Sequence, residues 1–258
     1  MNRLSGILLT TASLTALATG SGIAAAADRL SLTTGVDYST GKYGGTQSTD
    51  ITYVPITAKY QTGPWTLKLT LPYITVTGPG NVVPDVGQVS TSTTTRTTES
   101  GMGDVVAGAT YNVYWNKDTR TAVDLTGKVK FGTADEKKGL GTGKNDYSFQ
   151  VDVYKSFDRL TPFGTVGYKV LGDPAGYTLD NVFYGSLGFA YKVSSATSAG
   201  AIMDLRERST PTGSPRRELT GFVTHKLDRN WKLQGYAVKG FSDGSPAWGA
   251  GAMVTYSF

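Results

Sequence analysis

The sequence predicts an all-β protein: a single antiparallel up-and-down transmembrane β-barrel of about 12 strands. Three observations lead to this prediction. Apolar and polar residues alternate with a period of two through residues 28–258, the connections between the alternating segments are short and long in turn, and aromatic residues gather in two bands. A period of two separates an apolar face from a polar face only in a strand. Turn lengths and aromatic bands of this kind are typical of outer-membrane barrels.

The composition excludes several kinds of site. The chain has 258 residues, with 33 glycines, no cysteine and one histidine, His225. Without cysteine there is no disulfide scaffold, no Cys-ligated metal site, no thiol nucleophile and no lipid-modified N-terminal cysteine. A single histidine also excludes an all-histidine metal site. We therefore expect no cofactor and no metal site.

Residues 1–27 are predicted to be a secretory signal peptide, and residues 28–258 an outer-membrane β-barrel. Asn2 and Arg3 begin the segment, a mostly apolar stretch follows, and alanines at 24–27 offer cleavage sites. The alternative, a transmembrane anchor, is disfavoured because Gly20, Ser21 and Gly22 interrupt the apolar run. Removal of Arg3 leaves 24 basic against 20 acidic residues, a net charge of +4.

The strands are predicted one by one from their alternation. In residues 65–71 the odd positions are Trp and Leu and the even ones Thr and Lys, and the same pattern recurs around Val123, Phe149 and Val254. In chain order the predicted strands span residues 29–40, 48–61, 64–76, 102–116, 118–132, 145–157, 160–171, 179–193, 196–207, 216–227, 229–241 and 247–258.

The connections place the chain in a membrane with a definite orientation. Short turns lie at 61–64, 116–118, 157–159, 193–195 and 227–230, and longer loops rich in Gly, Ser, Thr and Pro lie at 41–47, 77–101, 133–144, 172–178, 208–215 and 242–246. Long loops at one end and short turns at the other predict an outer-membrane barrel with both termini in the periplasm.

Aromatic residues test this topology independently, because Trp and Tyr gather at the two membrane interfaces. A secreted β-sandwich, the soluble alternative, would show no such bands. The predicted band at the short-turn end contains Tyr60, Trp65, Trp115, Tyr191, Trp231 and Phe258, and the band at the long-loop end contains Tyr38, Tyr73, Phe131, Tyr147 and Trp248.

The C-terminus carries a resemblance to known proteins. The last alternating strand ends on Phe258 and is similar to the signal by which the barrel-assembly machinery recognises its clients. The run Phe-Ser-Asp-Gly-Ser-Pro-Ala-Trp-Gly at 241–249 resembles outer-membrane proteins of the phenol-degradation (meta-pathway) transporter family. The resemblance implies an outer-membrane barrel that passes small, often aromatic, compounds.

The motifs that would indicate catalysis are incomplete. Residues 240–244 match the nucleophile elbow of hydrolases, but that turn needs a following helix, and His225 is predicted at the opposite end of the barrel from Ser242. Residues 139–144 lack the spacing and the Ser or Thr of a phosphate-binding loop. We therefore predict no catalytic residues, no enzyme activity and no nucleic-acid partner.

The inward face is the candidate functional surface. If the apolar set of each strand faces lipid, both bases and acids face inward, and such charges require a wet or fully paired interior. The predicted lumen-lining residues are Asp37, Lys59, Lys68, Asp104, Asp124, Lys128, Lys130, Asp152, Lys169, Lys192, Asp204, Arg206, Glu218 and Lys232.

Whether the lumen is open depends on its width and on one loop. Twelve strands give a backbone diameter of roughly 24 Å, which leaves on the order of 10 Å between opposed side chains. The alternative is a lumen closed by paired charges and an infolded loop. Loop 77–101 is almost wholly Ser and Thr from Ser90 to Ser100 and is either solvated or folded inward as a constriction.

The sequence as a whole predicts a channel or transporter for the passive passage of small molecules, aromatic or apolar compounds among them, in the outer membrane of a Gram-negative bacterium. Alternative functions are a lipid-modifying barrel enzyme such as a phospholipase and a structural or adhesion barrel. The expected partners are membrane lipid including lipopolysaccharide, the barrel-assembly machinery and a small-molecule solute. Arg208, Arg216 and Arg217 are candidate lipopolysaccharide contacts, since arginine binds phosphate in a bidentate manner. Pairing with Glu207 and Glu218 is the alternative for these arginines.

Overall fold

The computed structural model describes residues 28–90, 95–211 and 213–258. The predicted signal peptide, residues 1–27, lies outside the described residues. No helix in this part of the chain is long and apolar enough to cross a membrane.

The secondary structure consists of strands and one 3-10 helix. Two very short strands, β4 and β5, lie in the loop that follows β3. The elements are β1 (Arg29–Gly41), β2 (Thr49–Thr62), β3 (Trp65–Gly78), β4 (Val82–Val83), β5 (Gly87–Gln88), β6 (Thr97–Met102), β7 (Val106–Asn116), β8 (Thr121–Lys130), η1 (Glu136–Lys138), β9 (Asp146–Lys155), β10 (Leu160–Val170), β11 (Val182–Lys192), β12 (Thr197–Arg206), β13 (Arg216–Lys226), β14 (Trp231–Gly240) and β15 (Trp248–Ser257).

The long strands form a closed antiparallel barrel. Each strand pairs with the next along the chain, and β1 closes the ring by pairing with β15 as well as with β2. Strands β6 and β7 both pair with β3 and together fill one position, so the ring has twelve positions. Closure leaves no edge strand, which lets every backbone polar group be satisfied inside the sheet. The predicted fold class is confirmed, and the predicted strands all appear.

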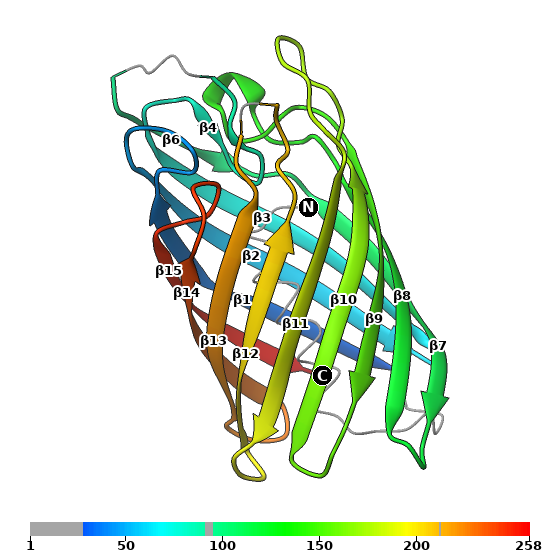
Figure 1. Ribbon diagram of the computed structural model, residues 1–258. Helices are drawn as coiled ribbons and strands as arrows, with labels where there is room; N and C mark the ends of the chain where they lie inside the picture. The colour runs from blue at the N-terminus through cyan, green and yellow to red at the C-terminus, as the bar shows by residue number, and fades with distance from the viewer. Residues whose placement is uncertain (1–27, 91–94, 212) are drawn as a thin grey trace.

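The long and short connections separate to opposite ends, as the sequence predicts. In Figure 1 the long loops lie at the top and the short turns at the bottom, and the strands between them are strongly tilted. The strands contain 10 to 14 residues, except for β4, β5 and the short β6. Strands of this length and tilt cross the apolar layer of an outer membrane.

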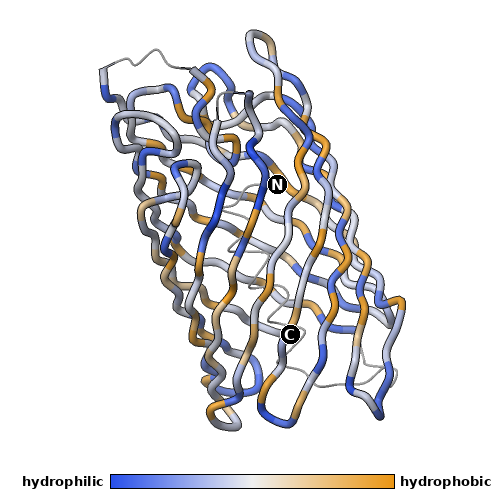
Figure 2. Tube along the Cα trace, viewed as in Figure 1, coloured by the Kyte–Doolittle hydropathy of each residue, from blue (hydrophilic) through white to orange (hydrophobic). Residues whose placement is uncertain are grey.

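The outer face of the barrel is apolar. Leu67, Leu69 and Leu71 on β3 are all exposed, while Thr70 between them and Pro72 after them are buried. Figure 2 shows hydrophobic positions recurring along the strands. Because one-residue alternation puts successive side chains on opposite faces, these exposed apolar residues form the surface that lipid contacts.

Aromatic rings contact one another at both ends of the barrel. At the short-turn end the ring centroids of Trp231 and Tyr256 are 4.8 Å apart, and Phe258 packs edge-on against Tyr256 at 4.9 Å. At the long-loop end Tyr38 and Trp248 lie 5.5 Å apart. The rings therefore occupy the two predicted interfacial bands, where Tyr and Trp are favoured.

Candidate functional site

The barrel interior holds most of the charged side chains that the sequence assigns to it. Within that predicted set, Lys192 alone is exposed, at the short-turn end of β11. The buried members are Asp37, Lys59, Asp104, Lys130, Asp152, Lys169, Arg206 and Glu218, and the half-buried ones are Lys68, Asp124, Lys128, Asp204 and Lys232.

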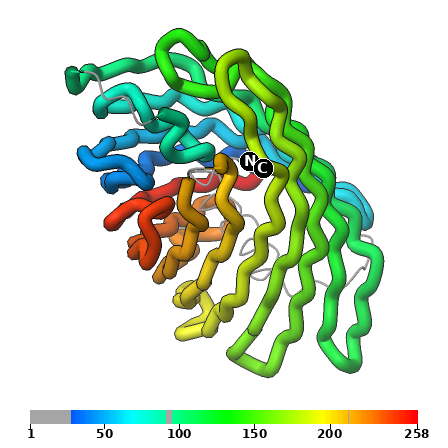
Figure 3. The backbone as a smooth tube through the Cα atoms, turned by 45° about the horizontal axis from the view of Figure 1, so that its top comes forward, coloured from blue at the N-terminus to red at the C-terminus, as the bar shows by residue number. Residues whose placement is uncertain are grey.

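The loop between β3 and β6 folds into the barrel. Residues 79–90, here called the inward loop, form a small hairpin in which Val82 pairs with Gln88 and Val83 with Gly87. Residues 81–87 are all buried. Figure 3, in which the top of the barrel comes forward, shows this segment lying within the ring of strands. The sequence left two alternatives for this loop, solvated or folded inward. Its first half is folded inward.

The tip of the hairpin is built to present one carboxylate. Asp85 has a φ of 71° and Gly87 a φ of 101°, in the region that favours glycine. Asp tolerates this region better than most residues because its short side chain bonds locally. The turn is closed by the Val86 N–H, which donates to the Val83 carbonyl at 3.2 Å.

Asp85 ties the inward loop to the far wall of the barrel. Its carboxylate accepts from Lys169 Nζ on β10 at 2.5 Å and from an Arg206 guanidinium nitrogen on β12 at 2.9 Å. Arg206 also donates to the Asp85 carbonyl at 2.6 Å, and Arg216 on β13 lies 4.0 Å away. Since β12 is six positions from β3 on the twelve-position ring, the inward loop and the side chain of Arg206 together bridge the lumen.

The charges around Asp85 set its protonation state. Burial alone would raise the pKa of this carboxyl group, but Lys169 and Arg206 hold the pKa well below its ordinary value. Asp85 is therefore an anion at neutral pH. A buried ion pair that loses one partner leaves an uncompensated charge, which costs about 3 to 5 kcal/mol.

Apolar contacts hold the two sides of the inward loop. Val82 packs in a cluster with Tyr43, Ile51 and Ile74, while Val83 and Val86 pack with Leu171 and Leu179 from the loop after β10. These contacts come from the β1, β2 and β3 side and from the β10 side respectively. The loop is thus clamped on both flanks in addition to its ion pairs.

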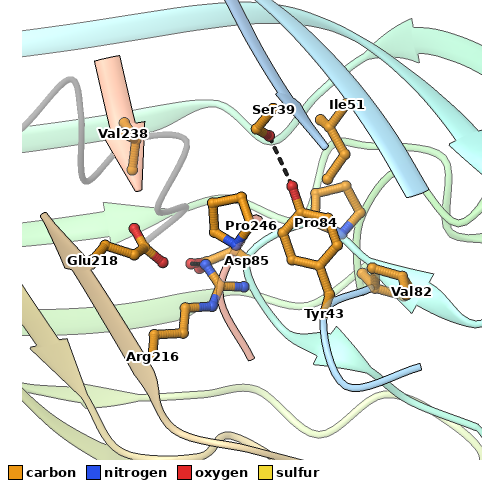
Figure 4. Close-up of a pocket in the computed structure, with 11 residues that line it drawn as sticks. Ser39, Tyr43, Ile51, Val82, Pro84, Asp85, Arg216, Glu218, Val238 and Pro246 are labelled. Atoms are coloured by element: carbon orange, nitrogen blue, oxygen red, sulfur yellow. Dashed lines mark hydrogen bonds and ion pairs between the residues drawn. The ribbon is translucent and has the colours of Figure 1, made fainter. Parts of the chain in front are cut away.

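A small cavity remains beside the inward loop. Figure 4 shows Asp85 facing the guanidinium of Arg216, with Glu218 next to that arginine and Tyr43 bonded to Ser39. The cavity has a volume of about 20 Å³, enough for about one water molecule. It is therefore too small for an organic solute, and the loop fills this sector of the cross-section.

A network of alternating charges extends from Asp85 along the wall. Lys169 also lies 3.1 Å from Asp146 on β9, Asp146 lies 3.4 Å from Lys130 on β8, and Lys130 donates to Asp104 at 2.6 Å. Sequence reasoning missed Asp85 because it lies in a loop. It missed Asp146 at the start of β9, although Asp146 has the same parity as Asp152 and could have been found from it.

An apolar cluster lies among the charged residues of the inner wall from β9 to β15, and the emphasis on charge also missed it. We call this cluster the apolar wall. It consists of Tyr154, Phe163, Ala190, Ile202, Phe222, Tyr236, Val238 and Met253.

The rings of the apolar wall lie over glycines of the neighbouring strand. A Cβ added to Gly188 on β11 would lie 2.6 Å from Cζ of Phe163, and one added to Gly251 on β15 would overlap the ring of Tyr236. In both cases the glycine is the direct register partner of the aromatic residue. The rings therefore lie along the wall instead of projecting across the lumen, which is one physical reason for the high glycine content.

Residues that could suggest hydrolysis are far apart. The Ser242 hydroxyl donates to the Pro215 carbonyl at 2.7 Å at the long-loop end, while His225 Nδ1 lies 2.8 Å from the Thr197 hydroxyl at the short-turn end. The described residues also contain no group of three or more His, Asp or Glu side chains arranged to hold a metal ion.

The predicted lipopolysaccharide contacts need one correction. Arg216 is buried and points inward to Asp85, because the alternation of β13 turns Arg216 and Glu218 inward together. Arg208 and Arg217 are exposed. Contact with lipopolysaccharide through those two residues, and recognition of Phe258 by the assembly machinery, stay predictions.

Comparisons with known proteins support the fold. No protein family and no curated protein matches the sequence. The COG4313 outer membrane channel from Pseudomonas putida F1 superimposes with a TM-score of 0.63 at 13% identity, over 90% of this chain and 94% of that one. The KdgM porin superimposes with a TM-score of 0.57 at 10% identity, over 88% of this chain and 99% of that one. The chain has the fold of outer-membrane channels and porins.

Proposed function

We propose that this chain is an outer-membrane channel for the passive passage of small molecules and that the inward loop narrows its lumen. The observation that carries the proposal is the course of that loop, which crosses a closed twelve-position barrel and is ion-paired to the opposite wall through Asp85.

The width of the barrel supports passage beside the loop. Barrels of eight strands are filled by side chains, whereas larger barrels enclose a cavity or channel. A twelve-position barrel has a backbone diameter of roughly 24 Å, so its cross-section is larger than that of an eight-stranded barrel filled by side chains. The rings that lie along the wall over Gly188 and Gly251 keep the remaining space from being filled.

The similar solved structures agree with a channel. Both the COG4313 protein and KdgM are described as a channel or a porin. A lipid-modifying enzyme is not favoured, because Ser242 and His225 lie at opposite ends of the barrel. Conductance measurements distinguish a channel from a purely structural or adhesive barrel.

The test is conductance in planar lipid bilayers. Purified, refolded or extracted protein without residues 1–27 should give discrete single-channel steps in potassium chloride, and proteoliposomes should swell in small sugars but not in large ones. A folded barrel that inserts, as shown by a β-rich circular dichroism spectrum, and yet gives no steps would contradict the proposal.

A further inference from the structure

Four lysines of the inner wall lie on a single register row of the sheet. The row runs perpendicular to the strands from β2 to β10, and every member faces the interior. Its residues, each paired with the next across neighbouring strands, are Lys59, Lys68, Gly108, Lys128, Ser148 and Lys169. We call the four lysines the lysine ladder.

The ladder climbs through the barrel because the strands are tilted. Lys59 lies three residues from the short-turn end of β2, and Lys169 lies next to the long-loop end of β10. The difference of about six residues along a strand tilted by about 40° corresponds to a rise of roughly 15 Å. The ladder therefore leads from the periplasmic mouth to the point where Asp85 holds the inward loop.

The lower half of the ladder carries charge that no salt bridge among the described residues neutralises. Lys169, at the top, is bridged by Asp85 and Asp146. Lys59 and Lys68 lie directly opposite each other, and within the described part of the chain no ion pair involves either of them. Like charges directly opposite on one face of a sheet are destabilising, so this pair is maintained at a cost in free energy.

The burial of Lys59 also favours a ligand at this pair. Lys59 is 9% exposed and faces the interior, where solvation of its ammonium group is restricted. Of the nearby carboxylates, Asp124 accepts from Asn112 at 2.6 Å, and Asp152 accepts from Thr165 at 2.6 Å and attracts Lys68 without forming a salt bridge to it. A small anion between the two lysines would offset both the repulsion and the loss of hydration.

The apolar wall faces the ladder across the lumen. Strand β8, which carries Lys128, is six positions from β14, which carries Tyr236, and β7 is six positions from β13, which carries Phe222. The two walls lie on the order of 10 Å apart between side chains. One side of the path thus carries the lysine ladder, and the other carries the apolar and aromatic cluster together with Lys232 on β14.

We infer that the lumen selects organic monocarboxylates with an apolar body, the carboxylate moving along the ladder past Lys68 and Lys59 while the body follows the apolar wall. The inference rests on the proposed channel function and adds a solute class to it. It also gives the repulsive pair of lysines a role that a purely structural barrel would not require.

The test compares two solutes of nearly the same shape. In proteoliposomes, benzoate should enter the wild-type protein severalfold faster than its neutral counterpart benzamide, and faster than acetate, which lacks the ring. In planar bilayers with a potassium chloride gradient, the reversal potential should have the sign of anion selectivity. These measurements use the unaltered chain and do not depend on the folding of any variant.

The variants assign the selectivity to the ladder. Lys59→Met with Lys68→Met should move the reversal potential toward zero and abolish the preference for benzoate, while benzamide entry is kept. The matched control removes two exposed lysines near the periplasmic end, Lys117→Met with Lys155→Met, and should leave both readouts unchanged. Single Lys59→Met, expected to give a smaller shift in the same direction, serves if the double variant does not fold.

The outcomes separate the inference from the proposed function. Normal single-channel steps without anion selectivity, or selectivity that survives the ladder variants, would overturn the inference and leave the channel intact. Absence of any conductance in a folded barrel would overturn both.

Discussion

At the scale of single residues, Asp85 fastens the inward loop to the far wall of the barrel. It is one carboxylate shared by Lys169 and Arg206, with Arg216 close by, and it sits at the tip of a loop that starts on the opposite wall. Because Asp85 has a positive φ, the conformation of the turn also helps to place its carboxylate against these cations. Removal of its charge should therefore act on the loop as a whole.

We expect Asp85→Asn to release the inward loop. Arg206 would lose its ion pair with Asp85 and Lys169 would keep only Asp146, at a cost of about 3 to 5 kcal/mol. The single-channel conductance should rise, and the loop should become a site of proteolytic cleavage in the otherwise intact barrel. Asp118→Asn, in an exposed turn at the short-turn end, is the matched control and should change neither readout. Unchanged conductance and protease resistance in Asp85→Asn would show that the apolar clamps alone hold the loop.

The depressed pKa of Asp85 also predicts how the channel responds to pH. A carboxyl group whose pKa is lowered on docking stabilises the docked state above its undocked pKa, about 4, and loses that contribution as the pH falls through the lowered value. The conductance of the wild-type channel should thus be constant from pH 7 to about pH 4 and rise only in stronger acid. A titration of conductance near pH 6 would contradict this assignment.

At the scale of elements, the strands pack their inner side chains by a rule that links adjacent strands. Aromatic residues on one strand lie over glycines on the next, as Tyr236 does over Gly251. The sequence shows the glycines, and it shows which strands they belong to. Which ring covers which glycine depends on the register between strands, and register is a property of the assembled sheet.

Gly251→Ala should therefore narrow the lumen. A methyl group at this position overlaps the Tyr236 ring, and the backbone gives it no other way out than rotation of that ring toward the lumen. Single-channel conductance should fall, and the bond from Tyr236 to Asp37 at 2.8 Å should be lost. Gly235→Ala provides the control, since a Cβ at Gly235 on the same strand pair meets nothing within 4 Å. Equal conductance in the two variants would mean that the ring has room elsewhere.

At the scale of the whole molecule, closure joins the first and last strands, and the chain end takes part in it. The Phe258 N–H donates to the Leu30 carbonyl at 3.0 Å, and the Phe258 ring packs on Tyr256. Phe258 is nonetheless 63% exposed on the outer surface. Lipid could thus replace most of the packing contacts of its side chain.

Deletion of Phe258 should accordingly lower the yield of protein in the outer membrane more than it lowers the stability of barrels that do form. The heat-modifiable electrophoretic mobility of the extracted barrel reports its stability. The amount of protein recovered from the membrane reports the yield. Phe157→Ser, which removes an exposed aromatic residue from a periplasmic turn, should affect neither. If the two variants behave alike, the terminal ring has no special part in assembly.

Much of this architecture follows from local patterns in the sequence, and the parts that do not follow share one cause. Alternation, turn length and aromatic bands predict the strands, their number and the inward parity of residues such as Lys59 and Asp37. The position of the inward loop, the pairing of Asp85 with Lys169 and the lysine ladder depend on which strands become neighbours in a sheared ring. Arg216 is the exception, because its inward parity with Glu218 on β13 is a local pattern that the prediction did not extend to the strand end.

The measurement that tests the central claim most directly is the single-channel conductance of the barrel without its inward loop. Residues 79–90 are replaced by a short Gly-Ser connection, and the variant is compared with the wild-type protein in the same bilayer and salt. The account predicts a barrel that still folds and a conductance several times that of the wild type, because the segment that crosses the lumen is gone. A folded variant with the wild-type conductance would contradict the claim that the inward loop constricts the channel.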